Sequence, residues 1–263
     1  MIERLTAVQF DRQAAHGRTM PGFIVAENAL CDGFELIVKL SARCDRAVTS
    51  LAMELLCACL ARDLGLPIPQ PYTVDITQEW IESIADPTWA AAALESVPVA
   101  FGSRRVPSGF GQWVAGTSML GPLASMAAGV LLFDAVTDNP DRRQINPNCL
   151  QLGQEIRIFD HELCFGPILI GWTPPWQVGS LQHLTTSGNH IFRDALRGRD
   201  IEWVGITQLW KELSDDTISG YEAVIPSEWG DALPHVQEAL TKIKNARDHI
   251  DECAIEVQRV LKC

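Results

Sequence analysis

Three polar side chains that could act on a phosphate group lie close together in the sequence. Asp141 and Asn146 are five residues apart in NPDRRQINPN, and Asp160 follows fourteen residues later in RIFDHEL. Lys39 lies far upstream, in the apolar run FELIVKL. Transfer of a phosphoryl group needs a carboxylate that orients the attacking hydroxyl, oxygen ligands for Mg²⁺, and a cation on the other phosphates. We therefore expect Asp141 to orient the acceptor and Lys39 to clamp the phosphates of ATP. Asn146 and Asp160 are the expected Mg²⁺ ligands.

Each of these residues also has a simpler interpretation. Asp141 stands beside Arg142 and Arg143 and could belong to a solvated charge cluster. Asn146 precedes a proline and could serve only as a turn residue, while Lys39 near the end of a strand could be a surface lysine. The order and spacing of the whole set, rather than any single member, favour phosphate chemistry.

Local patterns around these residues predict how they are presented. Asp138-Asn139-Pro140 is a turn signal that would end an apolar helix and place Asp141 in an exposed loop. The segment 155–160 alternates as a strand does, so Asp160 is expected at a strand end, where functional side chains enter clefts. Glu54 flanks the apolar stripe of a predicted helix and could pair with Lys39 or simply face solvent.

Residues 1–103 are expected to form a small β-rich lobe with one helix. Asp-Gly between two apolar runs indicates a β-turn, and apolar residues at helical spacing end at a Gly and a Pro. The predicted elements are strands 22–28 and 34–40, a helix over 49–63, a short edge strand in 68–76, a helical or irregular insert over 78–95 and a strand over 97–103.

Residues 104–263 are expected to form a mostly helical lobe that carries the catalytic loop and the metal site. Its predicted elements are a core helix over 122–136, strands near 148–152 and 155–160, a long loop over 173–189, a helix over 201–214 and a final helix over 235–261. The apolar stripe of the final helix indicates packing on its own lobe. A homodimer through that helix is the alternative.

Composition narrows the class of partner. The 263 residues carry a formal net charge of −12, which argues against nucleic acid as a partner, although Arg104, Arg105, Arg142 and Arg143 could form a local phosphate-binding patch.

The first twenty residues carry charges and lack an apolar core. We therefore expect a cytoplasmic protein whose eight cysteines are reduced thiols. The uncharged run 113–133 is long enough to span a bilayer, but Gly121-Pro122 interrupts it, so a core helix is expected instead.

The segments NPDRRQINPN and IFDHELCF resemble the catalytic and metal-binding segments of HipA-like kinases, which are distantly related to phosphatidylinositol 3/4-kinases. Further matches are FELIVKL, LARDLGLPIPQP and VAFGSR at 99–104, so the resemblance covers roughly residues 20–165. IPSEW at 225–229 is a looser match. Two departures stand out: Arg143 occupies a position where many relatives have histidine, and no G-x-G-x-x-G loop precedes Lys39. GRTMPG at 17–22 is the candidate for a phosphate-covering stretch.

The resemblance implies an α+β, bilobal protein-kinase-like fold that uses ATP and Mg²⁺, most simply as a serine/threonine protein kinase. It gives Lys39, Asp141, Asn146 and Asp160 the roles stated above. Glu54 could support the nucleotide site by pairing with Lys39, as a helix glutamate does in protein kinases. It also implies that VAFGSR lies near the hinge that holds the adenine, so that the nucleotide is contacted by Phe101, Gly102 and Ser103.

Several functions stay open at this level. The acceptor could be a protein, a small molecule or a lipid headgroup, and its pocket is expected among the segments after residue 165. A pseudokinase that binds nucleotide or a partner protein is a further alternative. So is a nucleotidyl transferase on the same fold, which would transfer AMP rather than a phosphoryl group.

Overall fold

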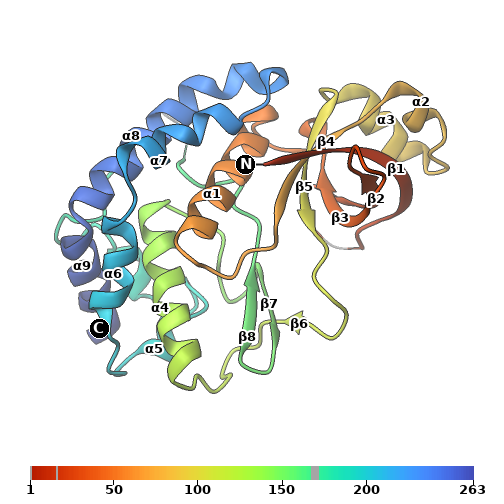
Figure 1. Ribbon diagram of the computed structural model, residues 1–263. Helices are drawn as coiled ribbons and strands as arrows, with labels where there is room; N and C mark the ends of the chain where they lie inside the picture. Colours follow the sequence, from red (N-terminus) through yellow and green to blue (C-terminus); the bar gives the residue numbers. More distant parts are fainter. Residues whose placement is uncertain (1, 16, 167–171) are drawn as a thin grey trace.

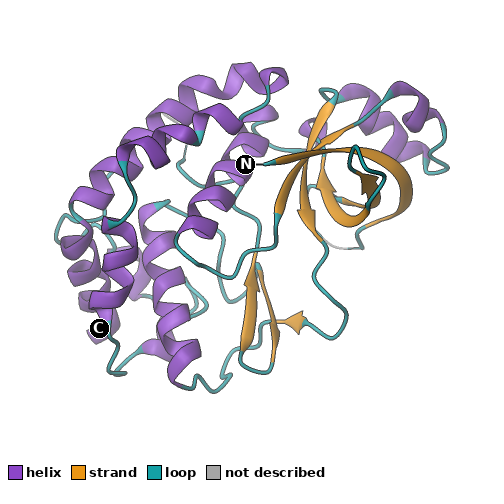
Figure 2. Ribbon diagram, viewed as in Figure 1, coloured by secondary structure: helices purple, strands orange, loops and turns teal. Residues whose placement is uncertain are grey.

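Five strands close into a barrel, at the right of Figures 1 and 2. The computed structural model describes residues 2–15, 17–166 and 172–263. In barrel order the strands are β1 (Glu3–Gln13), β2 (Gly22–Glu27), β3 (Gly33–Lys39), β5 (Val99–Arg104) and β4 (Pro71–Asp75). β1 and β4 pair in parallel, and the other neighbours are antiparallel. Alternate residues such as Leu36 and Val38 fill the interior, so Lys39 points outward from the last position of β3.

The barrel differs from the expected sheet at two strands. β4 was expected to be an edge strand, but it is paired on both sides, with β1 and with β5. β1 was not predicted at all, and it is the strand that closes the barrel and removes the edge. Two register shifts, between Ala7 and Gln9 and between Phe10 and Arg12, break its period of two.

Two helices of the predicted insert, α2 (Gln78–Glu82) and α3 (Pro87–Glu95), lie over the barrel (Figure 1). Thr77 and Asp86 cap their first turns by accepting backbone N–H groups. Trp89 is fully buried, with its ring centroid 4.8 Å from that of Phe10. A Cβ atom at Gly22 would stand 2.8 Å from the Trp89 ring, so this strand position requires glycine.

Helix α1 (Val48–Asp63) lies between the barrel and the helical part of the chain (Figure 1). Thirteen of its sixteen residues are buried, because α4 (Gly121–Val136), the C-terminal helices and the barrel surround it. Trp229 contributes to this packing and donates its indole N–H to the carbonyl of Val99 in β5, at 2.9 Å. The helix therefore belongs to the main hydrophobic core and not to the barrel alone.

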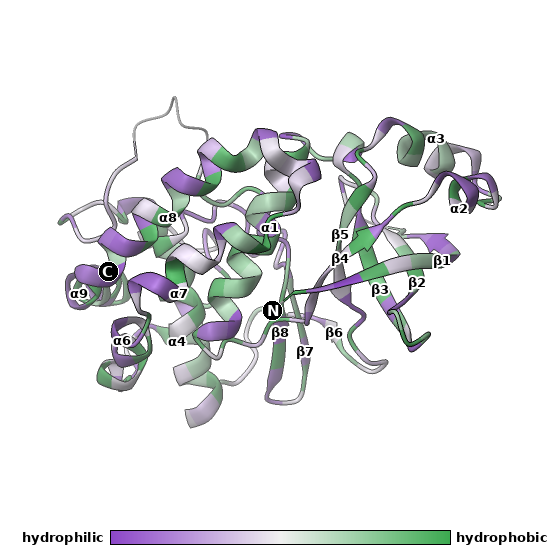
Figure 3. Cartoon of the chain, turned by 45° about the horizontal axis from the view of Figure 1, so that its top comes forward, coloured by the Kyte–Doolittle hydropathy of each residue, from purple (hydrophilic) through white to green (hydrophobic). Residues whose placement is uncertain are grey.

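The final helical segment is two helices rather than one. α8 (Leu233–Asp248) and α9 (Ile250–Lys262) meet at His249, whose φ of −118° and ψ of 26° are not helical. The predicted apolar stripe is buried inside the same chain, including Val236, Ile243 and Val257. This placement favours packing on the chain's own core over a dimer through the stripe. Figure 3 shows hydrophilic and hydrophobic residues side by side along α6 and α9.

The remaining elements complete a mixed α+β fold, as predicted. β6 (Gly111–Gln112), β7 (Cys149–Leu152) and β8 (Glu155–Ile158) form a small sheet beneath the barrel in Figure 1. Within the described ranges, no helix combines the length and apolarity needed to cross a bilayer. The other helices are α5 (Arg193–Leu196), α6 (Trp203–Lys211), α7 (Asp215–Gly220) and the 3₁₀ turns η1 (Ser41–Arg43), η2 (Gln182–Thr185), η3 (Glu222–Val224) and η4 (Ser227–Ala232).

Candidate active site

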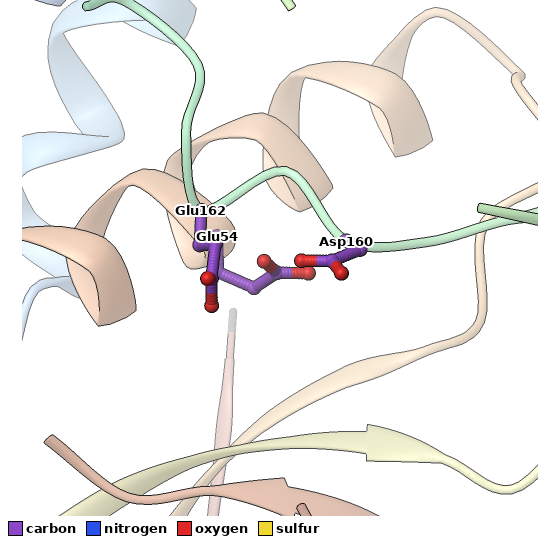
Figure 4. A group of neighbouring side chains, drawn as sticks. All are labelled: Glu54, Asp160 and Glu162. Carbon is purple, nitrogen blue, oxygen red and sulfur yellow. The ribbon is translucent and has the colours of Figure 1, made fainter. Parts of the chain in front are cut away.

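Three carboxylates surround the ammonium group of Lys39. Its Nζ lies 2.6 Å from Asp160 Oδ1 and 3.1 Å from an oxygen of each of Glu54 and Glu162. Figure 4 shows these carboxylates converging from α1 and from the turn that follows β8. The structure thus brings together three residues selected from the sequence, Lys39, Glu54 and Asp160, from segments up to 121 residues apart.

The local backbone geometry brings the side chains of Lys39, Glu54 and Asp160 close together. Lys39 is the last residue of β3 and lies opposite Phe101 of β5, on the outer face of the barrel. Asp160 follows β8 by two residues and adopts a left-handed φ of 64°, which is uncommon outside glycine and reverses the chain. The backbone N–H of His161 then donates to Glu54 Oε2 at 2.8 Å, so the turn is held directly against α1.

Burial and charge determine the protonation of this cluster. Burial disfavours the charge of Lys39, but Asp160, Glu54 and Glu162 outweigh it and hold the pKa of Lys39 well above its ordinary value. Burial raises the pKa of Glu54 to about 7, against the opposing effect of Lys39. For Asp160, burial is outweighed by the charge and hydrogen bond of Lys39, so its pKa is lowered. With every group ionised, three carboxylates and one ammonium leave two excess negative charges.

The cluster offers one carboxylate to a hard divalent cation. Oxygens of Glu54, Asp160 and Glu162 all lie within 4.8 Å of one another, with the ammonium of Lys39 between them. Asp160 is the most exposed of the three, and oxygen is the ligand atom that Mg²⁺ prefers. The excess negative charge of the cluster also matches a cation of charge +2. Asn146, the other predicted ligand, contacts Asp141 instead of this cluster.

The catalytic-loop candidates Asp141 and Asn146 are in direct contact. Asn146 Nδ2 donates to Asp141 Oδ2 at 2.7 Å, and Asn148 Nδ2 donates to the same oxygen at 3.1 Å. The backbone N–H of Asp141 donates to Asn139 Oδ1 at 3.1 Å, which is the turn expected from Asp138-Asn139-Pro140. Two amides therefore orient one carboxylate in a loop that reaches the surface.

Arg142 is buried, which contradicts its placement in a solvated charge cluster or a basic patch. Its Nε donates to Asp134 Oδ2 at 2.6 Å, and it also donates to the carbonyls of Asn148 and Phe159. Its Nη2 lies 2.8 Å from His161 Nε2. One guanidinium thus ties the catalytic loop to α4 and to the end of β8, because its five donors reach several acceptors in fixed directions.

His190 completes this buried network from a distant segment. Its Nε2 lies 3.0 Å from Asp134 Oδ2, and its Nδ1 accepts the backbone N–H of Phe192 at 3.1 Å. A neutral ring with its proton on Nε2 therefore satisfies both contacts, because Nε2 donates to Asp134 and Nδ1 accepts from Phe192. Burial and the charge of Arg142 lower the pKa of His190, although Asp134 opposes them.

We predict a pH-dependent loss of stability from His190. The pKa of His190 is lower in the folded chain than the ordinary histidine pKa of about 6.5, which applies in the unfolded chain. Below that pH the unfolded chain therefore binds a proton at His190 that the folded chain does not bind. Folding stability therefore falls as the pH drops from 7 to 5, by at most about 1.4 kcal/mol per pH unit. Urea unfolding at several pH values should show a shallower slope in His190→Gln. The exposed His183 is the control, and an equal change of slope in His183→Gln would contradict the assignment.

The predicted nucleotide-contacting residues of β5 do not share one face. Phe101 and Ser103 lie on the outer face, opposite Lys39 and Ile37 of β3. Gly102 faces the barrel interior, where a Cβ atom would stand 2.8 Å from Val74 and 3.2 Å from Leu36. The side-chain position of Gly102 is therefore directed away from the face that carries Lys39.

The stretch 17–22 forms the turn between β1 and β2. Met20 N–H donates to the carbonyl of Gly17 at 3.1 Å, and Gly17 has a φ of 107°, in the region that favours glycine. Arg18 forms an ion pair with Asp45, on the segment that leads into α1. Part of the region expected to hold the acceptor pocket, residues 167–171, lies outside the described residues.

Sequence reasoning missed several members of the site. Glu162, two residues after Asp160, was passed over although it contacts Lys39. Asp134 was also missed, and its signal was available: it is the one charged residue in the apolar helix α4. A lone charge on a buried helix needs a partner, and Arg142 is that partner. Asn148 and His190 gave no comparable signal.

The chain is similar to known kinases in sequence pattern and in fold. A family model described as HipA-like kinase matches residues 8–257. Among solved structures, the chain is similar to the crystal structure of the Helicobacter pylori proinflammatory kinase CtkA, with 11% sequence identity and a TM-score of 0.52. That match covers 97% of this chain and 99% of the other. At such low identity the likeness concerns the fold alone. No curated protein matches the chain.

Proposed function

The chain belongs to the HipA-like kinase family, and from this membership we propose that it is an ATP- and Mg²⁺-dependent phosphotransferase acting on a hydroxyl of a protein serine or threonine. The observation that carries the proposal is the contact of Lys39 with both Glu54 and Asp160, at 3.1 and 2.6 Å. A lysine paired with a helix glutamate and placed beside a metal-binding aspartate is the arrangement that a kinase needs around its phosphates.

The proposed fold is bilobal. Residues 1–103, with the barrel and α1, form the lobe that carries Lys39, and residues 104–263 carry the catalytic loop and the metal ligands. We assign the nucleotide contacts to Phe101 and Ser103, on the outer face of β5, and to the backbone of Gly102. The small sheet β6–β8 leads the chain to Asp160.

Each residue of the site has a proposed task. Bound Mg²⁺–ATP supplies the phosphoryl group and a cation that offsets the phosphate charge. Lys39 donates to the phosphates that are not transferred, and Glu54 keeps its ammonium in place. Asp160 and Asn146 offer oxygen ligands to Mg²⁺. Asp141, oriented by the two asparagine amides, accepts the hydrogen bond of the acceptor hydroxyl and aligns it for in-line attack.

Labelled ATP tests this function directly. Purified protein is incubated with Mg²⁺ and a total cell lysate, with ATP labelled either at the γ-phosphate or at the α-phosphate. We expect label from the γ-position alone, on a protein component, and none with Asp160→Asn. Label from the α-position alone would establish AMP transfer instead. Label on a small molecule or lipid would change the acceptor class, and an absence of Mg²⁺-dependent ATP binding would refute the proposal.

A further inference from the structure

All the hydrogen-bond donors of Lys39 are engaged by carboxylates. An ammonium group has three N–H bonds, and Glu54, Asp160 and Glu162 each lie within 3.1 Å of Nζ. A phosphate oxygen can therefore receive a hydrogen bond from Lys39 only after one carboxylate has moved away.

The three carboxylates differ in how firmly they are held. Glu54 Oε2 also accepts the backbone N–H of His161 at 2.8 Å, and its side chain is 5% exposed. The Glu162 side chain is 11% exposed, and its backbone carbonyl accepts from the guanidinium of Arg46. The Asp160 side chain is 28% exposed. Asp160 is thus the carboxylate with the most freedom to leave.

We propose that Glu162 is a positioning residue for Lys39 and makes nucleotide binding depend on bound metal. Its carboxylate holds the ammonium group from a second side, as Glu54 does from the first, and we call this contact the brace. This inference rests on the proposed function. When Asp160 turns toward Mg²⁺, Lys39 keeps Glu54 and Glu162 on two sides and gains one free N–H for a phosphate oxygen. Without the metal, Asp160 stays on Lys39, no donor is free, and the excess negative charge of the cluster repels the triphosphate.

Glu162 contributes one unit of the negative charge of the cluster, so replacing it with a neutral residue should relax the metal requirement. Glu162→Gln keeps the shape of the side chain, but an amide holds an ammonium less firmly than a carboxylate does. ATP added without metal can then accept a hydrogen bond from an N–H group of Lys39, and it is repelled by one negative charge fewer. Removal of one unit charge about 5 Å from the triphosphate, in a partly buried site, should change the affinity for ATP at least about tenfold after screening by salt.

Calorimetric titration of ATP tests the brace. The dissociation constant is measured with Mg²⁺ and again with EDTA, and the ratio of the two values reports the metal requirement. We expect this ratio to fall at least about tenfold in Glu162→Gln relative to the wild type. Glu162→Asp, which keeps the charge, should retain the wild-type ratio. So should Glu155→Gln, which makes the same change of net charge at an exposed site on β8.

The outcomes separate this inference from the proposed function. Wild-type protein that binds Mg²⁺–ATP, with an unchanged ratio in Glu162→Gln, would overturn the brace alone. Folded Glu162→Gln that no longer binds Mg²⁺–ATP would also overturn it, because Glu162 would then be a metal ligand. Wild-type protein that binds no Mg²⁺–ATP would refute both. If Glu162→Gln does not fold, Glu162→Ser removes the same charge and is measured in its place.

Discussion

Asp141→Asn is expected to reduce phosphoryl transfer by about 10²- to 10⁴-fold while Mg²⁺–ATP binding stays within about twofold of the wild type. The substitution keeps the shape of the side chain. It removes the carboxylate that is proposed to accept a hydrogen bond from the hydroxyl group of the acceptor. Asn146 and Asn148, which donate to Asp141 Oδ2 at 2.7 and 3.1 Å, would face an amide in place of a carboxylate. The loss should therefore appear in the rate of transfer and not in nucleotide affinity.

Asp138→Asn is the matched control for this loss. Asp138 is an exposed carboxylate three residues earlier in the same segment, with a left-handed φ of 51° that asparagine tolerates. Transfer of γ-label and calorimetric ATP binding are measured for both variants. A chain in which Asp141→Asn transfers phosphate as fast as Asp138→Asn does not use Asp141 as the orienting base.

Lys39→Met should destabilise the protein as well as inactivate it. It leaves the buried Glu54 and Glu162 and the half-buried Asp160 together without their shared cation, and removal of one partner from a buried ion pair costs about 3–5 kcal/mol. The destabilisation should shrink as the pH falls from 7.5 to 5.5. Burial raises the pKa of Glu54 to about 7 even against the opposing effect of Lys39, so the folded variant binds a proton there as the pH falls. A group whose pKa is higher in the folded chain than in the unfolded chain adds stability as the pH decreases.

Urea unfolding at the two pH values measures this effect, and ATP titration measures the loss of binding. Lys211→Met is the control, since Lys211 pairs with Asp251 at the surface and its loss should change stability by less than about 1 kcal/mol. An unfolding free energy of Lys39→Met equal to that of the wild type at both pH values would show that the cluster does not depend on its lysine.

The parts of the fold that follow a strict period were predictable. Strands β2, β3 and β5 and the helices α1 and α4 lie within a few residues of their predicted bounds. The apolar residues of α1 recur at helical spacing. Helix α4 was predicted instead from an uncharged run that Gly121-Pro122 interrupts. β1 was missed because its two register shifts break its period of two. The break between α8 and α9 was missed because His249 interrupts the helix without a proline or glycine to signal it.

The candidate site was predictable only where residue type and order carry information. Lys39, Glu54 and Asp160, which were selected from the sequence, lie in contact, and Asp141 contacts Asn146. Their roles stay predictions. Contacts that depend on a turn geometry were not accessible. Asp160 adopts a left-handed backbone in the turn that leads to Glu162. Aspartate adopts this conformation more often than most residues do, but the preference is too weak to identify one particular aspartate from the sequence. The inward direction of Gly102 likewise depends on the register of a closed barrel.

The near-complete burial of α1 limits how this site could be controlled. Thirteen of its sixteen residues are buried, and full exposure of one buried leucine costs about 1.5–3 kcal/mol. Swinging Glu54 away from Lys39 by turning α1 would expose several such side chains. That cost is comparable to the whole stability of a typical domain, about 5–15 kcal/mol. The pair of Lys39 and Glu54 is therefore assembled whenever the chain is folded, and we expect the proposed activity to be constitutive as far as this helix is concerned. An off-switch has to act elsewhere, by blocking the acceptor or by holding the turn that carries Asp160.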